Sequence, residues 1–254
     1  MNFAIIQGLL YPLVGTTIGA ASVYVIKDKI PPLLQRLLTG FAAGIMVAAS
    51  FFSLLNPALE QNPSILSVSL GFLVGMCFLL VLDTIIPHMH LDHSEEGMES
   101  GLKKTTKLLL AVTLHNLPEG MAVGVIYAGW MYGNHTISLS SATVLAIGIM
   151  IQNIPEGAIV SMPLLAEGMN KHKTFLYGFL SGIVEPLGAL LTIWASSFFV
   201  PMLPFFLSFA AGAMIYVVVE ELIPEMSEGK HTNWTTIVFA CGFVLMMILD
   251  ITLG

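Results

Sequence analysis

Charged residues are scarce in this 254-residue chain, where Asp, Glu, Lys and Arg together make up only 10% of the sequence. Apolar residues make up 56%, and the mean hydropathy is +0.87. A water-soluble domain cannot bury so large an apolar fraction, so the composition excludes soluble enzymes and soluble binding modules. Polar stretches long enough for a separate soluble domain are also missing. The chain is therefore interpreted as an integral membrane protein whose surroundings are the lipid bilayer.

Cysteine is rare as well, and the two present, Cys77 and Cys241, both lie within apolar runs. We interpret them as small core residues, since nothing favours a disulfide or a thiolate metal site. Residues 1–26 lack a basic segment and a clear cleavage site, so we expect a retained span rather than a signal peptide. The net charge of −7 says little about partners, because several acids lie within the spans, and we expect no nucleic-acid partner.

Eight apolar runs are long enough to cross a bilayer, because a span needs about 20 mostly apolar residues. The runs are continuous rather than alternating, which excludes a closed β-barrel. We therefore predict an all-α integral membrane protein forming a single transmembrane domain over residues 1–254. The predicted helices are 3–26, 33–56, 64–86, 106–130, 138–166, 174–198, 203–226 and 233–253.

The basic residues predict the orientation. With eight spans, every Lys and Arg falls on one side of the membrane, and the positive-inside rule makes that side cytoplasmic. Both termini are then extracytoplasmic, and the loop 87–105 is cytoplasmic. This loop contains His88, His90, Asp92 and His93. It either holds a metal weakly near an exit or is a His-containing loop without functional weight.

An internal repeat is visible in the second and seventh predicted spans. The stretch "FAAGIMVAASFFSLLNPALE", from Phe41, resembles "FAAGAMIYVVVEELIPE", from Phe209. The two spans run in opposite directions, so helices 1–3 and 6–8 are predicted as inverted repeats around helices 4 and 5. Inverted repeats with helix-breaking residues near mid-membrane are typical of secondary transporters. The alternative is a chance match between Gly- and Ala-rich segments.

Two related motifs, "HNLPEG" at 115–120 and "QNIPEG" at 152–157, lie in the fourth and fifth spans. Positions i and i+4 share one helix face, so His115 projects with Glu119, and Gln152 projects with Glu156. A carboxylate at mid-bilayer costs about 2.5–3.5 kcal/mol on insertion scales. Two facing carboxylates also repel unless a proton or a cation lies between them. A divalent cation removes both difficulties.

The ligand atoms of these motifs indicate the class of metal. Imidazole nitrogen with carboxylate and amide oxygens suits Zn²⁺, Fe²⁺, Mn²⁺ or Cd²⁺. Asn116 and Asn153 lie about 100° around each helix from the residues before them and could serve an adjoining position. Protons compete for the same ligands, so low pH should weaken metal binding. The alternative is that these polar groups only join helices.

The prolines and glycines of the motifs have a mechanical interpretation. Pro118 and Pro155 cannot donate to the carbonyl one turn earlier, so each helix is expected to kink beside its acid and free a carbonyl. Gly120 and Gly157 should allow a neighbouring helix to approach closely.

Other polar residues in the spans are weaker candidates. Glu185 is either a third carboxylate facing the same cavity or an acid that pairs helices. One of Glu220 and Glu221 lines an exit, or both belong to a solvated helix end. Met46 could offer a thioether to the pathway, although a methionine there is a core residue by default.

The paired motifs, the eight spans and the His-bearing loop after the third span resemble the ZIP (Zrt-, Irt-like protein) metal transporters, in particular their prokaryotic GufA-like branch. The resemblance covers essentially the whole chain. It implies import of divalent metal into the cytoplasm, zinc foremost, through a binuclear centre between helices 4 and 5. It also implies a multi-pass cell-membrane protein, often a homodimer, in which one helix group moves against another to give alternating access. No organic cofactor is implied.

The resemblance also implies a ligand set. The first metal position corresponds to His115, Glu119, Gln152 and Glu156, with Met46 nearby. The second corresponds to Asn116, Asn153 and Glu185, with Glu119 and Glu156 bridging.

This chain departs from the family pattern at three positions. Many relatives carry His in place of Gln152, some carry Asp in place of Asn153, and His is common in place of Glu220. A neutral Asn153 should weaken the second position, which leaves open whether two metals bind at once.

The sequence thus favours a transporter and not an enzyme. The alternative is an intramembrane metalloenzyme, a hydrolase that would activate water at the same His/Glu site. Against it, there is no HExxH motif and nothing suggests a substrate cleft. A metal-sensing receptor is a third class, but the short loops offer nothing to relay a signal.

Overall fold

The computed structural model describes residues 3–26, 30–61, 64–89, 95–132, 137–166, 168–198 and 200–254. Almost all of the described chain is helical, and eight helical segments are long and apolar enough to cross a membrane. They are Phe3–Tyr24, Pro32–Gln61, Ile65–Ile85, Lys104–Met131, Leu139–Ala166, Lys171–Ser197, Val200–Ser227 and Trp234–Leu253. The predicted all-α membrane class with eight spans is confirmed, and the largest boundary difference is the second span, which continues to Gln61.

Several spans are composed of more than one helical element. The first is α1 (Phe3–Ala20) with the 3₁₀ turn η1 (Ala21–Tyr24), and the third is α4 (Ile65–Ile85). The second joins α2 (Pro32–Ala48), the π-helix η2 (Ala49–Leu55) and α3 (Asn56–Gln61). The fourth and fifth are α5 (Lys104–Met131) and α6 (Leu139–Ala166), and the sixth joins α7 (Lys171–Gly182) to α8 (Val184–Phe198). The seventh joins η3 (Val200–Met202), α9 (Leu203–Val217), the π-helix η4 (Val218–Leu222) and α10 (Ile223–Ser227), and the eighth is α11 (Trp234–Leu253).

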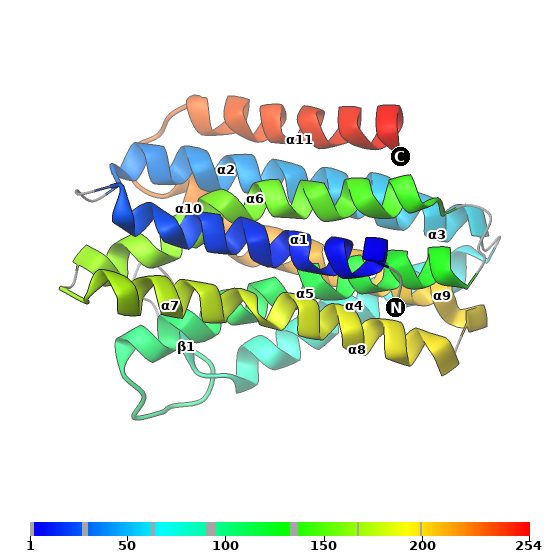
Figure 1. Cartoon of the computed structure of the whole chain (residues 1–254), viewed down its shortest axis with the longest axis horizontal. Coiled ribbons are helices and arrows are strands. Elements are labelled where there is room, and N and C mark those ends of the chain that lie inside the picture. Colours follow the sequence, from blue (N-terminus) through cyan, green and yellow to red (C-terminus); the bar gives the residue numbers. More distant parts are fainter. Residues whose placement is uncertain are drawn as a thin grey trace.

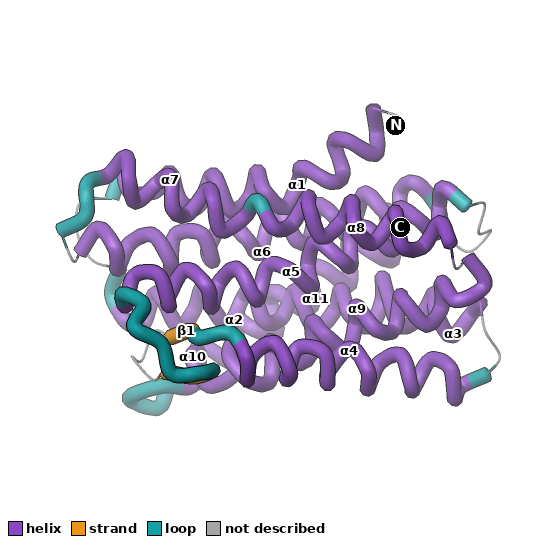
Figure 2. Tube along the Cα trace, turned by 90° about the horizontal axis from the view of Figure 1, so that it is seen from below, coloured by secondary structure: helices purple, strands orange, loops and turns teal. Residues whose placement is uncertain are grey.

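The helices run along one long axis as a bundle (Figure 1). Both chain ends lie toward one end of this bundle. The opposite end carries a short hairpin, in which β1 (His88–Met89) pairs antiparallel with β2 (Glu95–Glu96) (Figure 2). This agrees with an even number of spans, while the side of the membrane that each end faces stays a prediction.

The second, fourth and fifth spans are the most buried in the bundle. In each of them 67% of an apolar stretch is buried, against 22% for the third span and 11% for the eighth. The two motif-bearing helices are therefore enclosed by other helices, while the third and eighth spans present most of their surface outward.

The second and eighth spans touch through glycines. A Cβ atom on Gly44 would lie 2.0 Å from the carbonyl oxygen of Phe239. One on Gly242 would lie 2.2 Å from the carbonyl oxygen of Phe41. Only glycine permits such backbone contact, which is a common way for helices to associate in membranes.

The third and seventh spans repeat this contact. A Cβ atom on Gly75 would lie 2.0 Å from the carbonyl oxygen of Phe209, and one on Gly212 equally close to that of Phe72. In both pairs a Phe-x-x-Gly segment crosses a second Phe-x-x-Gly segment. An inverted repeat would produce such matched crossings, and the repeat itself remains our proposal.

Departures from α-helical winding lie away from the motif prolines. Helices α5 and α6 continue unbroken through Pro118 and Pro155. The π-helical segments η2 and η4 interrupt the second and seventh spans, and the sixth span is broken at Ile183. A helix enclosed by neighbours can continue past a proline because only one intrahelical hydrogen bond is lost.

The interpretation of the cysteines as core residues was wrong. Cys77 and Cys241 are both exposed on the outer faces of α4 and α11. An apolar run does not distinguish inward from outward positions in a membrane protein, because lipid solvates apolar side chains as well as a core does.

Candidate metal centre

The two motifs meet in the centre of the bundle. The Gln152 side-chain amide on α6 donates to Glu119 Oε1 on α5 at 2.8 Å. Both side chains are completely buried. The packing of α5 on α6 therefore brings the acid of one motif, Glu119, against the first residue of the other, Gln152.

A second group of polar side chains adjoins this pair. The Asn153 amide donates to Glu185 Oε1, in the first turn of α8, at 3.0 Å. The hydroxyl of Thr16 on α1 donates to the same oxygen at 2.7 Å. The Asn153 amide also lies 3.3 Å from Thr16 Oγ1. All three residues are buried, so the prediction that Glu185 faces the motif residues is supported by these contacts.

Five buried oxygen atoms of these residues lack a hydrogen-bond partner among the residues that the structure describes. They are Glu119 Oε2, Gln152 Oε1, Asn153 Oδ1, Glu156 Oε1 and Glu185 Oε2. Buried polar atoms are almost always partnered, so five acceptors without donors in neighbouring residues need a physical explanation. The partners that Glu119 and Glu185 do have are amides and a hydroxyl rather than basic groups. A proton, a water molecule or a cation would each satisfy such acceptors.

The two motif glycines allow α8 and α1 to pack closely against α5 and α6, which brings Glu185 and Thr16 to the motif residues. A Cβ atom on Gly120 would lie 2.2 Å from the carbonyl oxygen of Glu185, and one on Gly157 would lie 2.4 Å from that of Thr16. The predicted close approach at both glycines is confirmed. Each motif therefore provides the surface against which one neighbouring helix brings a polar side chain to the centre.

His115 lies beside this centre and faces another direction. Its Nε2 atom is paired with Glu221, which belongs to the π-helix η4 of the seventh span. Glu221 is buried, whereas Glu220 is exposed. One acid of this pair was expected to line an exit; Glu221 is the one that lines a cavity here, and the exit itself stays a prediction.

A cavity connects His115 with the hairpin end of the bundle. It measures about 50 Å³, which is enough for several water molecules, since about 10–15 Å³ holds one. Four titratable side chains and a surrounding apolar wall line it: His115, Glu156, Glu221, Glu225, Thr39, Met89, Leu108, Ala111, Val112, Ile159, Val160 and Leu222. The cavity therefore lies between the motif residues His115 and Glu156 and the hairpin residue Met89, toward the end of the bundle predicted to be cytoplasmic.

Two predicted ligands have other surroundings. The Asn116 amide donates to the carbonyl oxygen of Ser181 at 3.1 Å, beside the break in the sixth span, so its donor group is used in joining α5 to α7. Met46 is fully buried in the hydrophobic core of the second span, which is the alternative considered for it.

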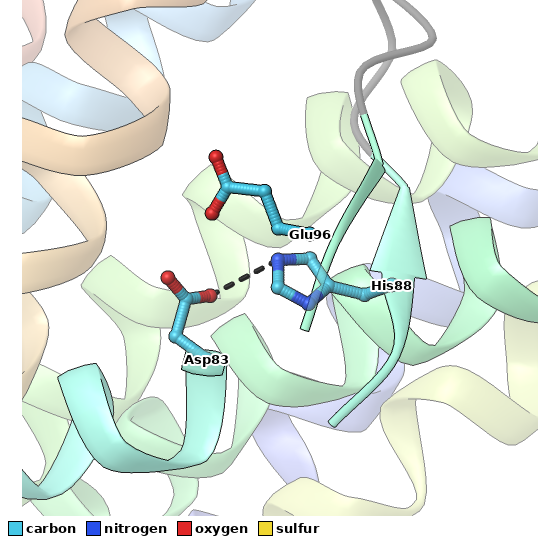
Figure 3. A group of neighbouring side chains, drawn as sticks. All are labelled: Asp83, His88 and Glu96. Atoms are coloured by element: carbon cyan, nitrogen blue, oxygen red, sulfur yellow. Dashed lines mark ion pairs between the residues drawn. The ribbon is translucent and has the colours of Figure 1, made fainter. Parts of the chain in front are cut away.

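A separate polar group lies at the start of the predicted cytoplasmic loop (Figure 3). His88 Nε2 is 3.0 Å from Asp83 Oδ1, and Tyr216 donates to the other oxygen of Asp83 at 2.8 Å. Asp83, His88 and Glu96 offer ligand atoms within 4.8 Å of one another and could hold a metal ion. His90, Asp92 and His93 lie outside the described residues, so the prediction for the loop is untested at those positions.

Sequence reasoning missed Thr16 and the His115–Glu221 pair. Thr16 lies in "VGTTIGA", where a threonine between glycines carries no signal that separates a ligand from a packing residue. Glu221 stands in the sequence beside an equivalent Glu220, and the sequence alone does not indicate which of the two faces inward.

The chain is similar to known zinc transporters over most of its length. The model of the ZIP zinc transporter family matches residues 92–250. The chain is 33% identical to human zinc transporter ZIP11 over 99% of its length and 98% of that protein. It is 38% identical to zinc transporter GufA of Myxococcus xanthus, over 95% of the chain and 96% of the relative. It is 37% identical to zinc transporter ZIPB of Bordetella bronchiseptica, over 87% and 72%. The chain belongs to the ZIP family, in the branch that includes GufA.

Proposed function

We propose that this protein imports Zn²⁺ across a cell membrane into the cytoplasm, through a metal site between α5 and α6. The observation that supports this most directly is the group of five unpartnered buried oxygens at the two motifs. Family relatives named as zinc transporters support zinc as the substrate. Fe²⁺, Mn²⁺ and Cd²⁺ prefer overlapping ligands and are proposed as further substrates.

The proposed path has two metal positions and one exit. Glu119, Gln152, Glu156 and His115 form the first position, and Asn153 and Glu185 form the second together with the shared acids. The cavity lined by His115, Glu156 and Glu221 then leads to the cytoplasm. Carboxylate, amide and imidazole ligands without thiolate hold the ion weakly enough for it to leave, as flux requires. Alternating access by relative motion of helix groups, and a homodimeric assembly, belong to this proposal.

Removing both shared carboxylates should abolish transport. A Glu119→Gln, Glu156→Gln double variant keeps the shapes of the side chains and removes the two negative charges facing the ion. We expect saturable Zn²⁺ uptake into proteoliposomes from wild type and background uptake from the double variant. The matched control is Glu60→Gln, Glu228→Gln, which makes the same chemical change at two exposed positions and should transport normally.

The opposite results are equally informative. Wild type that binds Zn²⁺ and passes none would overturn the transport proposal and favour the metalloenzyme or receptor alternatives. A double variant that transports like wild type would show that the ion takes another route.

Metal binding should weaken as the pH falls. Carboxylate and imidazole ligands must lose their protons to bind metal, so each bound ion competes with protons. We expect the apparent Zn²⁺ affinity of the purified protein, followed by equilibrium dialysis, to decrease from about pH 8 to about pH 5, a range that includes His titration. If the affinity does not change over that range, the result would count against imidazole and carboxylate ligation.

A further inference from the structure

Thr16, on the first span, packs against the fifth span in the same way that Glu185, on the sixth span, packs against the fourth. The Thr16 carbonyl lies over Gly157 of one Pro-Glu-Gly sequence, and the Glu185 carbonyl lies over Gly120 of the other. Both contacts are so close that a Cβ atom on either glycine would lie within 2.4 Å of the carbonyl oxygen. The two neighbouring helices are thus held at the same level of the two motifs, one carrying a carboxylate and the other a hydroxyl.

The Thr16 hydroxyl is directed at the carboxylate. Its oxygen lies 2.7 Å from Glu185 Oε1 and 3.3 Å from the Pro12 carbonyl one turn earlier, so the shorter and charge-assisted contact is the one across the helices. Thr16 is 2% exposed. The Asn153 amide donates to the same carboxylate oxygen and also approaches the Thr16 hydroxyl, which closes a three-membered hydrogen-bonded group.

The two carboxylate oxygens of Glu185 have different surroundings. Oε1 receives two donors, whereas Oε2 is buried without a hydrogen-bond partner, as is Asn153 Oδ1. A carboxylate held at one oxygen cannot rotate freely, so the other oxygen keeps a fixed direction. Residues that orient metal ligands in this way commonly change metal affinity by about 10–100-fold when they are removed.

We propose that Thr16 is a positioning residue of the second metal position: by donating to Glu185 Oε1 it orients Glu185 Oε2 toward the ion and raises the affinity of that position. This inference rests on the proposed function, because it assumes that Glu185 binds the transported metal. It adds the first span to a site otherwise assembled from the fourth, fifth and sixth.

Three substitutions test it. Thr16→Val keeps the shape and removes the hydroxyl, and Thr16→Ser keeps the hydroxyl. Thr17→Val makes the same change one residue later, where the hydroxyl donates only to the backbone carbonyl of Leu13. We expect Zn²⁺ binding at the second metal position, measured by equilibrium dialysis, to be about 10–100-fold weaker in Thr16→Val than in wild type. Thr16→Ser and Thr17→Val should bind like wild type.

A double-mutant cycle separates positioning from general packing. If Thr16 acts through Glu185, Thr16→Val should weaken binding in wild type and change nothing further in a Glu185→Gln background. Full additivity would overturn the proposal, as would Thr16→Ser binding as weakly as Thr16→Val, or Thr16→Val binding like Thr17→Val. Should Thr16→Val fail to purify as a monodisperse protein, Thr16→Ala replaces it in the same comparisons.

The cycle is independent of the transport assay. Wild type that gives no Zn²⁺ flux would refute the proposed function, while the binding cycle would still decide whether Thr16 acts through Glu185. Wild type that transports, with Thr16→Val binding normally, would refute this inference alone.

Discussion

Replacing Gly120 with alanine is expected to reduce Zn²⁺ uptake by about 100-fold or more, because it displaces Glu185 from the metal centre. The added Cβ atom would lie 2.2 Å from the Glu185 carbonyl oxygen and 2.7 Å from its Cα atom. Both are backbone atoms, so the overlap cannot be relieved by turning a side chain. Helix α8, which forms the second half of the sixth span, must move away by a large fraction of an ångström, and the carboxylate moves with it.

Gly188→Ala is the matched control for this prediction. Gly188 lies on the same contact between α5 and α8, but its new Cβ atom would lie 3.2 Å from a methyl carbon of Leu117 and 3.3 Å from the Leu117 carbonyl oxygen. A shift of a few tenths of an ångström relieves both contacts, so we expect a small loss of uptake. Initial rates in proteoliposomes at equal protein density measure both variants. Wild-type rates for Gly120→Ala would show that the position of Glu185 does not limit transport.

Replacing Gly44 with valine is expected to prevent accumulation of folded protein. The contact between α2 and α11 brings a backbone carbonyl within 2.0 Å of the site where Cβ would be built. Overpacking a core usually costs about 1–3 kcal/mol, and here the clash is with backbone rather than with a movable side chain. The helices would have to separate along their length, which removes the packing that holds them together in lipid.

Cys241→Val provides the control on the partner helix. Cys241 adjoins Gly242 but is exposed on the outer face of α11, so a β-branched side chain there should meet lipid and leave the contact intact. The yield of monodisperse protein in detergent and its thermal unfolding temperature distinguish the two variants. Equal yields and unfolding temperatures would show that the Phe-x-x-Gly crossing is dispensable.

Much of this architecture could be predicted from the sequence because the bilayer imposes a length on every span. Apolar runs of about 20 residues mark the spans even where no other signal is present. The motif acids could be placed on shared faces because residues four apart lie together on any α-helix. The contact of Gln152 with Glu119 follows from that geometry and the pairing of two adjacent helices.

The sequence could not supply what depends on helix rotation and irregular winding. Apolar side chains are compatible with both lipid and protein, so the outward positions of Cys77 and Cys241 carry no signature. Glu220 and Glu221 both lie in the π-helical turn η4, and the rotation of that turn within the bundle places Glu221 inward. Thr16 reaches Glu185 because two glycines allow four helices, α1, α5, α6 and α8, to converge.

The pair between His115 and Glu221 has a consequence for how metal occupancy is communicated through the bundle. The most extensive helix contacts join α1 with α6 and α5 with α8 on one hand, and α2 with α11 and α4 with α9 on the other. His115 belongs to the first set of helices and Glu221 to the second, so their contact crosses the division. An ion that takes Nε2 of His115 must either displace Glu221 or accept it as a ligand. On the proposed ligation, a loaded site and an empty one would therefore differ in one contact between the two sets of helices, beside the packing of α2 on α6 and of α5 on α9.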